Sequence, residues 1–261
     1  MGMRVTALLM RYLYLYRRSV ARAMAIVFWP VVDLLVWGFV TAYLQRIAVP
    51  EPILFLLGGV IFWDVFYSSA QAITLSVTEE IWGRNILNIF VAPVRVSELM
   101  LATCLLGGLR ALASTTLLSI LAWILYAFHV TAVGFVLAPF LASLLLFGWA
   151  MGIFTMALIL RYGQAAEALI WGMPFLIQPL SAVFYPLSVL PAWLQPIARG
   201  IPSTYVFEGM RSALRQGTVD PRLLFGAFAL DLAYLAAAAV FFAWMLEKVR
   251  ERGYLGRLGL E

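Results

Sequence analysis

The sequence predicts an all-α membrane protein with six transmembrane helices. Of its 261 residues, 64% are apolar and 12% are charged, whereas a soluble domain is about half apolar and about a quarter charged. The apolar residues form runs of about 20 or more, the length that a helix needs to cross a hydrocarbon core. The net charge is +5, and the basic residues lie at the ends of these runs. We therefore expect these residues to interact with anionic membrane lipid rather than with nucleic acid.

We expect one domain over 1–261, made of an interfacial helix over 4–22, a six-span bundle over 23–246 and a cytoplasmic tail over 247–261. The first segment is basic and amphipathic, which is typical of a helix lying in the headgroup plane. The alternative is a positive flank that only fixes topology. At 100° per residue, four arginines fall within about 40° of one another on this helix: Arg4, Arg11, Arg18 and Arg22.

The spans follow from the apolar runs. The first run is too long for a signal peptide, whose apolar core has about 7–15 residues. The fifth run contains Pro174 and Pro179 and ends near Pro186, and we expect these prolines to kink its helix. The predicted spans are 23–44, 53–77, 99–126, 131–160, 165–190 and 223–246.

Orientation follows from the Lys and Arg residues that flank the spans. With the N-terminus inside, the cytoplasmic segments hold twelve basic residues and the external segments hold five. Positive charge is retained on the cytoplasmic side. We therefore expect a multi-pass protein of a bacterial inner membrane with both termini in the cytoplasm.

Two connections differ from ordinary loops. The cytoplasmic connection over 78–99 has the apolar spacing of a short helix and ends at Pro93, which lacks an amide hydrogen. Such a rod can dock into a groove of a soluble partner or lie on the membrane. The external connection over 190–222 is too apolar for a solvated loop, and its prolines and glycines prevent it from spanning. We expect short re-entrant helices there.

One of these external helices is predicted in more detail. Ser203 or Thr204 is expected to cap it, and Gly217 to end it. Glu208 and Arg211 are three residues apart, so they can pair on one helix face.

Carboxylates inside spans are costly and should face protein or water. Asp33 and Asp64 either line a polar path or proton relay, or are hydrogen-bonded to a hydroxyl or protonated. Asp231 is more readily explained by such a hydrogen bond. The first two spans are dense in aromatic residues, which either line a path or pack helices and contact lipid. The residues that we assign to a possible substrate path are Asp33, Trp37, Asp64 and Gln178.

Single residues exclude several chemistries. Lys248 is the only lysine and follows Glu247, so the chain lacks the Gly-Lys of a phosphate-binding Walker loop. One cysteine, Cys104, permits no intrachain disulfide. One histidine, His129, permits no paired-histidine metal centre and supports no serine/histidine membrane enzyme.

The chain resembles the permease subunits of type-2 ABC exporters, known as ABC-2 type transporters. Four features in order carry the resemblance: the basic N-terminal helix, the cytoplasmic segment, the six-span layout and the external segment before the last span. The cytoplasmic segment matches at Gly83, Leu87, Pro93 and Glu98. The external segment matches at Leu190, Pro191, Pro202, Tyr205, Glu208, Arg211 and Gly217.

The resemblance implies a permease without enzymatic activity that exports an amphiphilic, lipid-like, glycan or drug-like substrate. It implies a second permease chain, in a homodimer, and a separate ATP-binding subunit that binds ATP and Mg. Glu208 and Arg211 would belong to helices that close the outer exit. The helix that couples to the ATPase would contain Glu79, Glu80, Trp82, Arg84, Leu87 and Phe90.

A second class is a proton-coupled secondary transporter that uses Asp33 and Asp64. It predicts transport that follows the proton gradient without an ATPase. The chain lacks the paired interrupted helices in corresponding halves that such transporters often contain.

Overall fold

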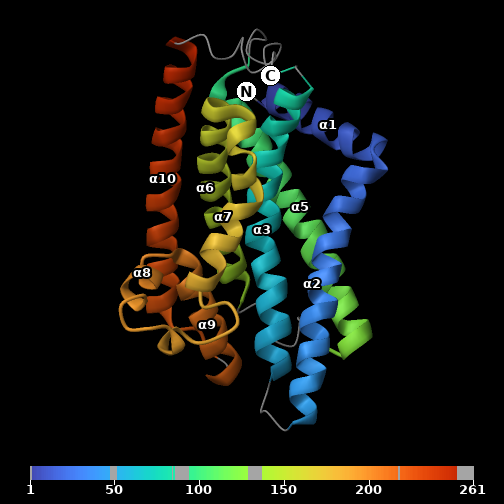
Figure 1. The fold of residues 1–261 in the computed structure, drawn as a ribbon, viewed down its shortest axis with the longest axis vertical. Coiled ribbons are helices and arrows are strands. Elements are labelled where there is room, and N and C mark those ends of the chain that lie inside the picture. The colour runs from blue at the N-terminus through green and yellow to red at the C-terminus, as the bar shows by residue number, and fades with distance from the viewer. Residues whose placement is uncertain are drawn as a thin grey trace.

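The computed structural model describes residues 2–47, 52–83, 85, 94–128, 137–216 and 218–251. In these ranges the regular structure is helical, without strands. Figure 1 shows a bundle of long, roughly parallel helices, with α1 crossing one end and α8 and α9 gathered at the other. The start of α1 and the end of α10 lie at the same end of the bundle (Figure 1).

The long helix α3 forms the centre of the bundle. Most of its side chains are buried, because α2, α5, α6 and α7 pack around it. The helix α10 packs chiefly on α6, at the edge of the bundle. The long helices are α2 (Val20–Arg46), α3 (Pro52–Trp82), α5 (Val96–Tyr126), α6 (Ala138–Tyr162) and α10 (Pro221–Glu251).

Two glycines bring α6 against α3. A Cβ added at Gly148 would lie 2.8 Å from the Phe66 carbonyl oxygen, and one added at Gly152 would lie 2.8 Å from the Ala70 carbonyl oxygen. Both distances are too short for a side chain. The four-residue spacing of the glycines puts them on one helix face, where small residues allow helix backbones to approach closely in membranes.

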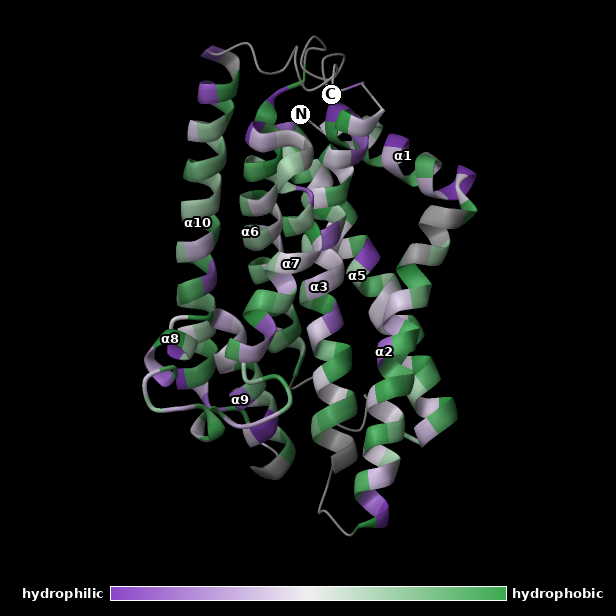
Figure 2. Cartoon of the chain, in the orientation of Figure 1, coloured by the Kyte–Doolittle hydropathy of each residue, from purple (hydrophilic) through white to green (hydrophobic). Residues whose placement is uncertain are grey.

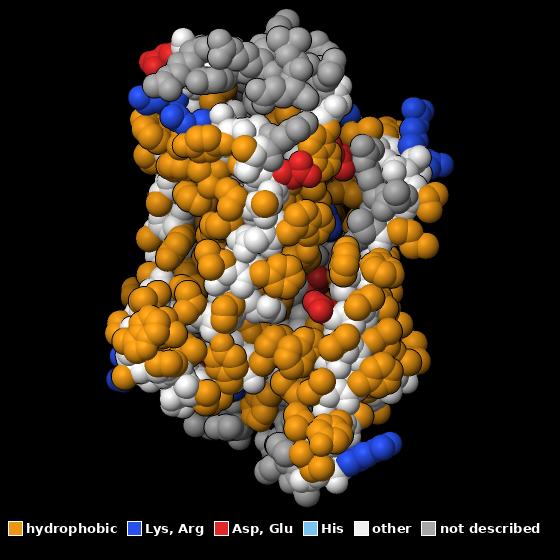
Figure 3. All heavy atoms as spheres, in the orientation of Figure 1, with side chains coloured by type: hydrophobic (Ala, Val, Ile, Leu, Met, Phe, Trp, Pro, Cys, Tyr) orange, Lys and Arg blue, Asp and Glu red, His pale blue; other side chains and the backbone are white. Residues whose placement is uncertain are grey.

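Five described helices are long and apolar enough to cross a membrane. They correspond to the predicted first, second, third, fourth and sixth spans, and several extend beyond the predicted bounds. Figure 2 shows hydrophobic residues along most of their length, with hydrophilic residues gathered on α1 and near the ends of the bundle. On the face seen in Figure 3, apolar side chains cover the middle and most Lys and Arg lie at the ends. The chain is therefore a multi-pass, all-α membrane protein.

The predicted fifth span is the exception. The run over 165–190 forms α7 (Ala168–Ile177), followed by the short 3-10 turns η4 (Gln178–Leu180) and η5 (Leu187–Val189). The prediction of one kinked helix through residue 190 is wrong, because the continuous helical segment ends at Leu180 and residues 181–186 are not helical. The helix α7 starts at the end of the bundle where α6 ends and runs part of the way back (Figure 1).

The N-terminal helix α1 (Gly2–Arg18) ends at Arg18 rather than at the predicted residue 22, and α2 begins at Val20. The apolar face of α1 packs on α5. The buried residues in this contact are Val5, Leu8 and Tyr12 of α1 and Leu99, Ala102 and Leu106 of α5. The helix therefore lies against protein along one face, an arrangement that the interfacial interpretation had not included.

The predicted cytoplasmic helix begins inside a spanning helix. Glu79, Glu80 and Trp82 belong to the last turns of α3, so the prediction of a separate helix beginning at Glu79 is wrong. Arg84, Leu87 and Phe90 lie outside the described residues, as does the side chain of Arg22.

The segment between α7 and α10 contains two helices, α8 (Gln195–Arg199) and α9 (Pro202–Gln216). The predicted cap of α9 is wrong, because Ser203 and Thr204 lie inside the helix and bind another segment. The Ser203 hydroxyl donates to the Ser181 hydroxyl over 2.7 Å, and the Thr204 hydroxyl donates to the Leu180 carbonyl over 3.2 Å. Pro202 starts the helix, where a missing amide hydrogen costs nothing. Gly217 lies outside the described residues.

Candidate functional site

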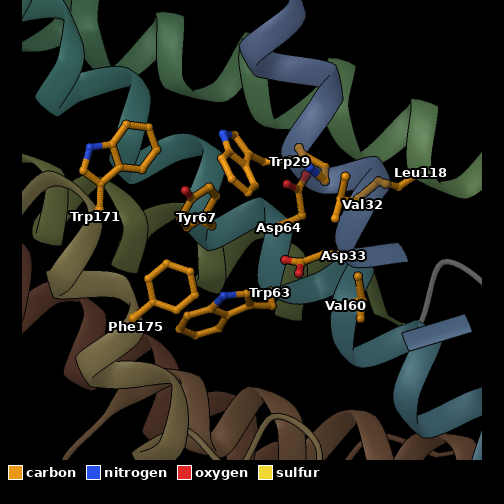
Figure 4. Close-up of a pocket in the computed structure, with 11 residues that line it drawn as sticks. Trp29, Val32, Asp33, Val60, Trp63, Asp64, Tyr67, Leu118, Trp171 and Phe175 are labelled. Atoms are coloured by element: carbon orange, nitrogen blue, oxygen red, sulfur yellow. The ribbon is translucent and has the colours of Figure 1, made fainter. Parts of the chain in front are cut away.

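A cavity of about 250 Å³ lies between α2, α3 and α7, and Leu118 of α5 also lines it. Its walls are mostly apolar and aromatic, and Figure 4 shows the rings on one side of two carboxylates, with aliphatic side chains on the other. The aromatic side chains come from three helices: Trp29 from α2, Trp63 and Tyr67 from α3, and Trp171 and Phe175 from α7.

Helical spacing explains how these side chains meet. Residues four apart lie on the same helix face. Trp29 and Asp33, Trp63 and Tyr67, and Trp171 and Phe175 are three such pairs, each presented by one helix. The two residues of α7 were not predicted from sequence, although their spacing is a signal that a systematic search for aromatic pairs would have found.

Asp64 lies at the inner side of the cavity. Its side chain is only 4% exposed, and the Ser68 hydroxyl donates a hydrogen bond to its Oδ1 over 3.1 Å. Its Oδ2 has no hydrogen-bond partner among the described residues. The predicted hydrogen bond to a hydroxyl therefore exists, but it satisfies only one of the two oxygens.

Asp33 differs from Asp64 in its surroundings. It is exposed and has no hydrogen bond or ion pair among the residues that the structure describes. It is close enough to Asp64 for the two carboxylates to interact electrostatically. Figure 3 shows acidic side chains in a hollow at mid-height, between apolar surfaces.

A polar cluster continues from the cavity toward α5. Arg110 of α5 is buried and acts electrostatically on both Asp64 and Tyr67. Its Nε has no hydrogen-bond partner within the described part of the chain, and the hydroxyl of Ser114, also on α5, interacts with the Asp64 carboxylate. Buried polar groups are usually hydrogen-bonded, so this cluster is an uncommon feature of the bundle interior.

The helix α7 is held over the cavity by a hydrogen bond that a proline makes necessary. Pro174 has no amide hydrogen, so it cannot donate to the carbonyl of Ile170 one turn earlier. The side-chain amide of Gln71, on α3, donates to that carbonyl over 3.3 Å and to the Tyr67 hydroxyl over 3.2 Å. Neighbouring helices commonly satisfy carbonyls freed in this way.

Two of the predicted path residues lie elsewhere. Trp37 stacks on Phe184 with ring centroids 4.0 Å apart, and Gln178 begins the η4 turn. Neither lines the cavity. The structure therefore brings Asp33 and Asp64 together and separates them from Trp37 and Gln178.

Asp231 has a structural partner, as expected. It is fully buried, and the Ser143 hydroxyl of α6 donates to its Oδ2 over 2.5 Å. This bond joins α10 to α6 outside the cavity.

The predicted pair of Glu208 and Arg211 is present on α9, with 3.1 Å between Nη2 of the arginine and Oε1 of the glutamate. It also fastens the chain that follows α7. The guanidinium of Arg211 donates to the carbonyls of Ala182 and Val183, and the amide of Leu187 donates to Glu208. The pair therefore fixes the fold of residues 182–187 on α9, whatever part it plays in closing an exit.

At the opposite end of the bundle, two arginines of α1 pair with other helices. Arg11 contacts Glu80 of α3 with two nitrogen–oxygen distances, 2.6 and 2.7 Å, and Asn85 donates to the same carboxylate over 2.7 Å. The hydrogen bond to Glu80 raises the pKa of Arg11 above its usual value. Arg4 lies 3.6 Å from Glu98 of α5, whereas Arg18 is exposed. The arginine stripe was predicted to face lipid headgroups, but at two positions it faces protein.

The family model described as ABC-2 type transporter matches residues 4–214. The matched region runs from α1 into α9 and includes every helix that lines the cavity. No curated protein matches the chain.

Proposed function

Because the chain belongs to the ABC-2 type transporter family, we propose that it is the permease subunit of an ATP-driven exporter whose ATP hydrolysis takes place on a separate subunit. The family assigns a permease component of an ABC transporter to this chain, and its members associate with an ATP-binding subunit. The observation that carries the proposal is the extent of the match, which includes both the α1 end of the bundle and the cavity.

The ATP-binding subunit docks, in this proposal, at the end of the bundle that carries α1. The end of α3 is there, and Trp82 is 47% exposed, although it is large and apolar. Arg11 and Asn85 both bind Glu80 in the turn before Trp82. A displacement of the segment after Trp82 would therefore move α3 and α1 together, and α3 forms one wall of the cavity.

The same end of the bundle faces the cytoplasm in this proposal. It holds the start of α1 and the end of α10 (Figure 1), so the chain passes the membrane an even number of times. Five long helices provide five passes, and α7 with its flanking turns provides the sixth. The termini then lie in the cytoplasm of a cell whose inner membrane contains the protein, and two copies of the chain form the transport unit.

The test is whether the chain co-purifies with an ATP-binding protein and whether ATP hydrolysis by the complex is coupled to transport. The chain is co-expressed with the ATP-binding protein encoded beside its gene, and the complex is reconstituted in lipid. We expect stable association and ATP hydrolysis that drives outward transport. Trp82→Ala should weaken association about tenfold or more, because truncation of an exposed aromatic anchor at an interface costs at least about 1.4 kcal/mol. Glu79→Arg should uncouple hydrolysis from transport.

The matched control is Trp193→Ala. Trp193 is also an exposed tryptophan, but it precedes α8 at the other end of the bundle. Its replacement should leave association unchanged. If the complex hydrolyses no ATP, the exporter proposal is wrong. If Trp82→Ala and Trp193→Ala change the affinity for the ATP-binding subunit equally, the assignment of the docking site to the end of α3 is wrong.

A second candidate function, proton-coupled transport, is favoured by one observation, the proximity of Asp33 and Asp64. It predicts transport that continues without the ATP-binding subunit and stops when the proton gradient is dissipated. The reconstituted complex distinguishes the two functions directly, because only the exporter depends on ATP.

A further inference from the structure

We propose that the cavity between α2, α3 and α7 binds an amphiphilic organic cation with a single positive charge, such as a small quaternary ammonium compound with an aromatic body. The claim that this molecule is then carried across the membrane rests on the proposed function. The claim that it binds does not, because it follows from the charges, rings and size of the cavity.

The charge of the site favours one positive charge in the ligand. The lining contains two carboxylates, Asp33 and Asp64, and no basic side chain among the described residues. Arg110 lies behind Asp64 and acts on it electrostatically. When both carboxyl groups are ionised, two negative charges and one positive charge leave one negative charge uncompensated. Asp33 has no hydrogen bond or ion pair in the described chain. A carboxylate at this depth in a membrane protein calls for a counter-ion.

The rings supply the second half of the recognition. In Figure 4 the rings lie on one side of the carboxylates, with aliphatic side chains on the other. The rings are those of Trp29, Trp63, Tyr67, Trp171 and Phe175. Aromatic faces attract cations, tryptophan most strongly, and cages of such rings recognise quaternary ammonium groups. Tyr67 and Phe175 lie with ring centroids 6.3 Å apart, so rings from α3 and α7 form adjacent parts of one wall. An anion would be repelled by the two carboxylates and would meet no basic side chain in the described lining.

The size and position of the cavity narrow the ligand further. A volume of about 250 Å³ is below the range of about 300–1,000 Å³ typical of sites for drug-sized molecules. We therefore specify a small cation. Trp29 and Phe175 are 55% and 58% exposed on the two helices that flank the opening. A molecule that has partitioned into the bilayer would enter between α2 and α7.

The binding test compares two molecules of the same shape. Benzyltrimethylammonium carries one positive charge, and neopentylbenzene has carbon in place of its nitrogen. The purified full chain in lipid nanodiscs, without ATP or partner, is equilibrated with radiolabelled benzyltrimethylammonium in the presence of increasing neopentylbenzene. We expect the cation to bind saturably. We expect the neutral competitor to bind with an affinity at least about tenfold lower, because it lacks the charged contact. Equal affinity for the two molecules, or no saturable binding of the cation, would overturn the proposal.

Variants locate the site. Asp33→Asn should weaken cation binding about tenfold or more, and Asp33→Glu should keep most of it because the charge remains. Glu247→Gln, which removes one negative charge from an exposed position on α10, should leave binding unchanged. If Asp33→Asn binds the cation as tightly as the wild-type chain, the proposal is wrong. The comparison of the two probes on the wild-type chain remains decisive if Asp33→Asn does not fold.

The binding experiment and the test of the proposed function can fail independently of each other. Saturable cation binding by a chain that shows no ATP-dependent transport with its partner would refute the exporter and leave the site standing. A complex that couples ATP hydrolysis to transport of another molecule, but whose permease fails to bind the cation, would refute only the site.

Discussion

The ion pair between Arg11 and Glu80 is the contact whose removal is most informative about how α1 is attached. Two nitrogen–oxygen contacts, 2.6 and 2.7 Å long, join the guanidinium to the carboxylate. The side chain of Glu80 is 4% exposed and that of Arg11 is 36% exposed. The perturbation is a double-mutant cycle of Arg11→Gln, Glu80→Gln and both together, which replaces the charges and keeps much of the volume.

The expected magnitude follows from this geometry. Breaking a fully buried pair costs about 3–5 kcal/mol, whereas an exposed pair contributes about 0–1 kcal/mol. With one buried and one partly exposed partner, we expect Arg11→Gln to cost about 2 kcal/mol, because Glu80 keeps only Asn85 as a charge-stabilising donor. Glu80→Gln should cost about 1 kcal/mol, because the amide oxygen still accepts hydrogen bonds. The coupling energy should be about 1 kcal/mol, typical of directly contacting residues.

The assay uses the only cysteine of the chain. Cys104 is buried, so a thiol-reactive dye reports unfolding in detergent as this thiol becomes exposed. A loss of 1 kcal/mol lowers Tm by about 2–4 °C in chains of this size, so Arg11→Gln should lower Tm by about 4–8 °C. Arg18→Gln, an exposed position on the same helix, should leave Tm within about 1 °C. Additive effects of the two single substitutions would refute the reasoning, because they would mean that Arg11 and Glu80 do not stabilise each other.

Two further substitutions test the packing of the bundle and the attachment of α7. Gly152→Ala should destabilise the protein by about 1–3 kcal/mol, because its Cβ would meet the Ala70 carbonyl, whereas Gly108→Ala, which has space for a methyl group, should not; equal Tm values would contradict the close helix contact. Gln71→Leu should cost about 1–3 kcal/mol by leaving the Ile170 carbonyl unsatisfied and should also weaken cation binding; unchanged stability and binding would show that this bond does not hold α7.

The sequence located the long helices well because the hydrocarbon core imposes a minimum apolar length. It did not predict how far some of these helices extend beyond the apolar runs. The second span was predicted over 53–77, and α3 continues through Glu79 and Glu80 to Trp82. Polarity changes at the membrane surface, but backbone hydrogen bonding does not stop there, so a helix continues into polar sequence. A hydropathy pattern therefore measures the membrane-embedded part of a helix rather than the helix.

Contacts between helices could not be predicted from the periodicity of the sequence. The arginine stripe on α1 was visible in the sequence, but periodicity describes only one helix and cannot show that Arg11 meets a carboxylate 69 residues away. The pair of Glu208 and Arg211 was predictable because its partners share a helix face. Asp33 and Asp64 were recognised as unusual from their position in apolar runs, and their proximity depends on how α2 packs against α3.

Pro174 lies inside α7 and explains how this helix is attached beside the cavity. Without its amide hydrogen, the carbonyl of Ile170 needs a donor from outside α7, and Gln71 on α3 supplies it. That bond fixes α7 beside α3 at the level of Trp171 and Phe175, the residues that follow Ile170 and Pro174, respectively. Both rings line the cavity. The carbonyl that Pro174 leaves without an intrahelical donor is therefore the point at which α7 is joined to α3, beside the cavity that its two rings line.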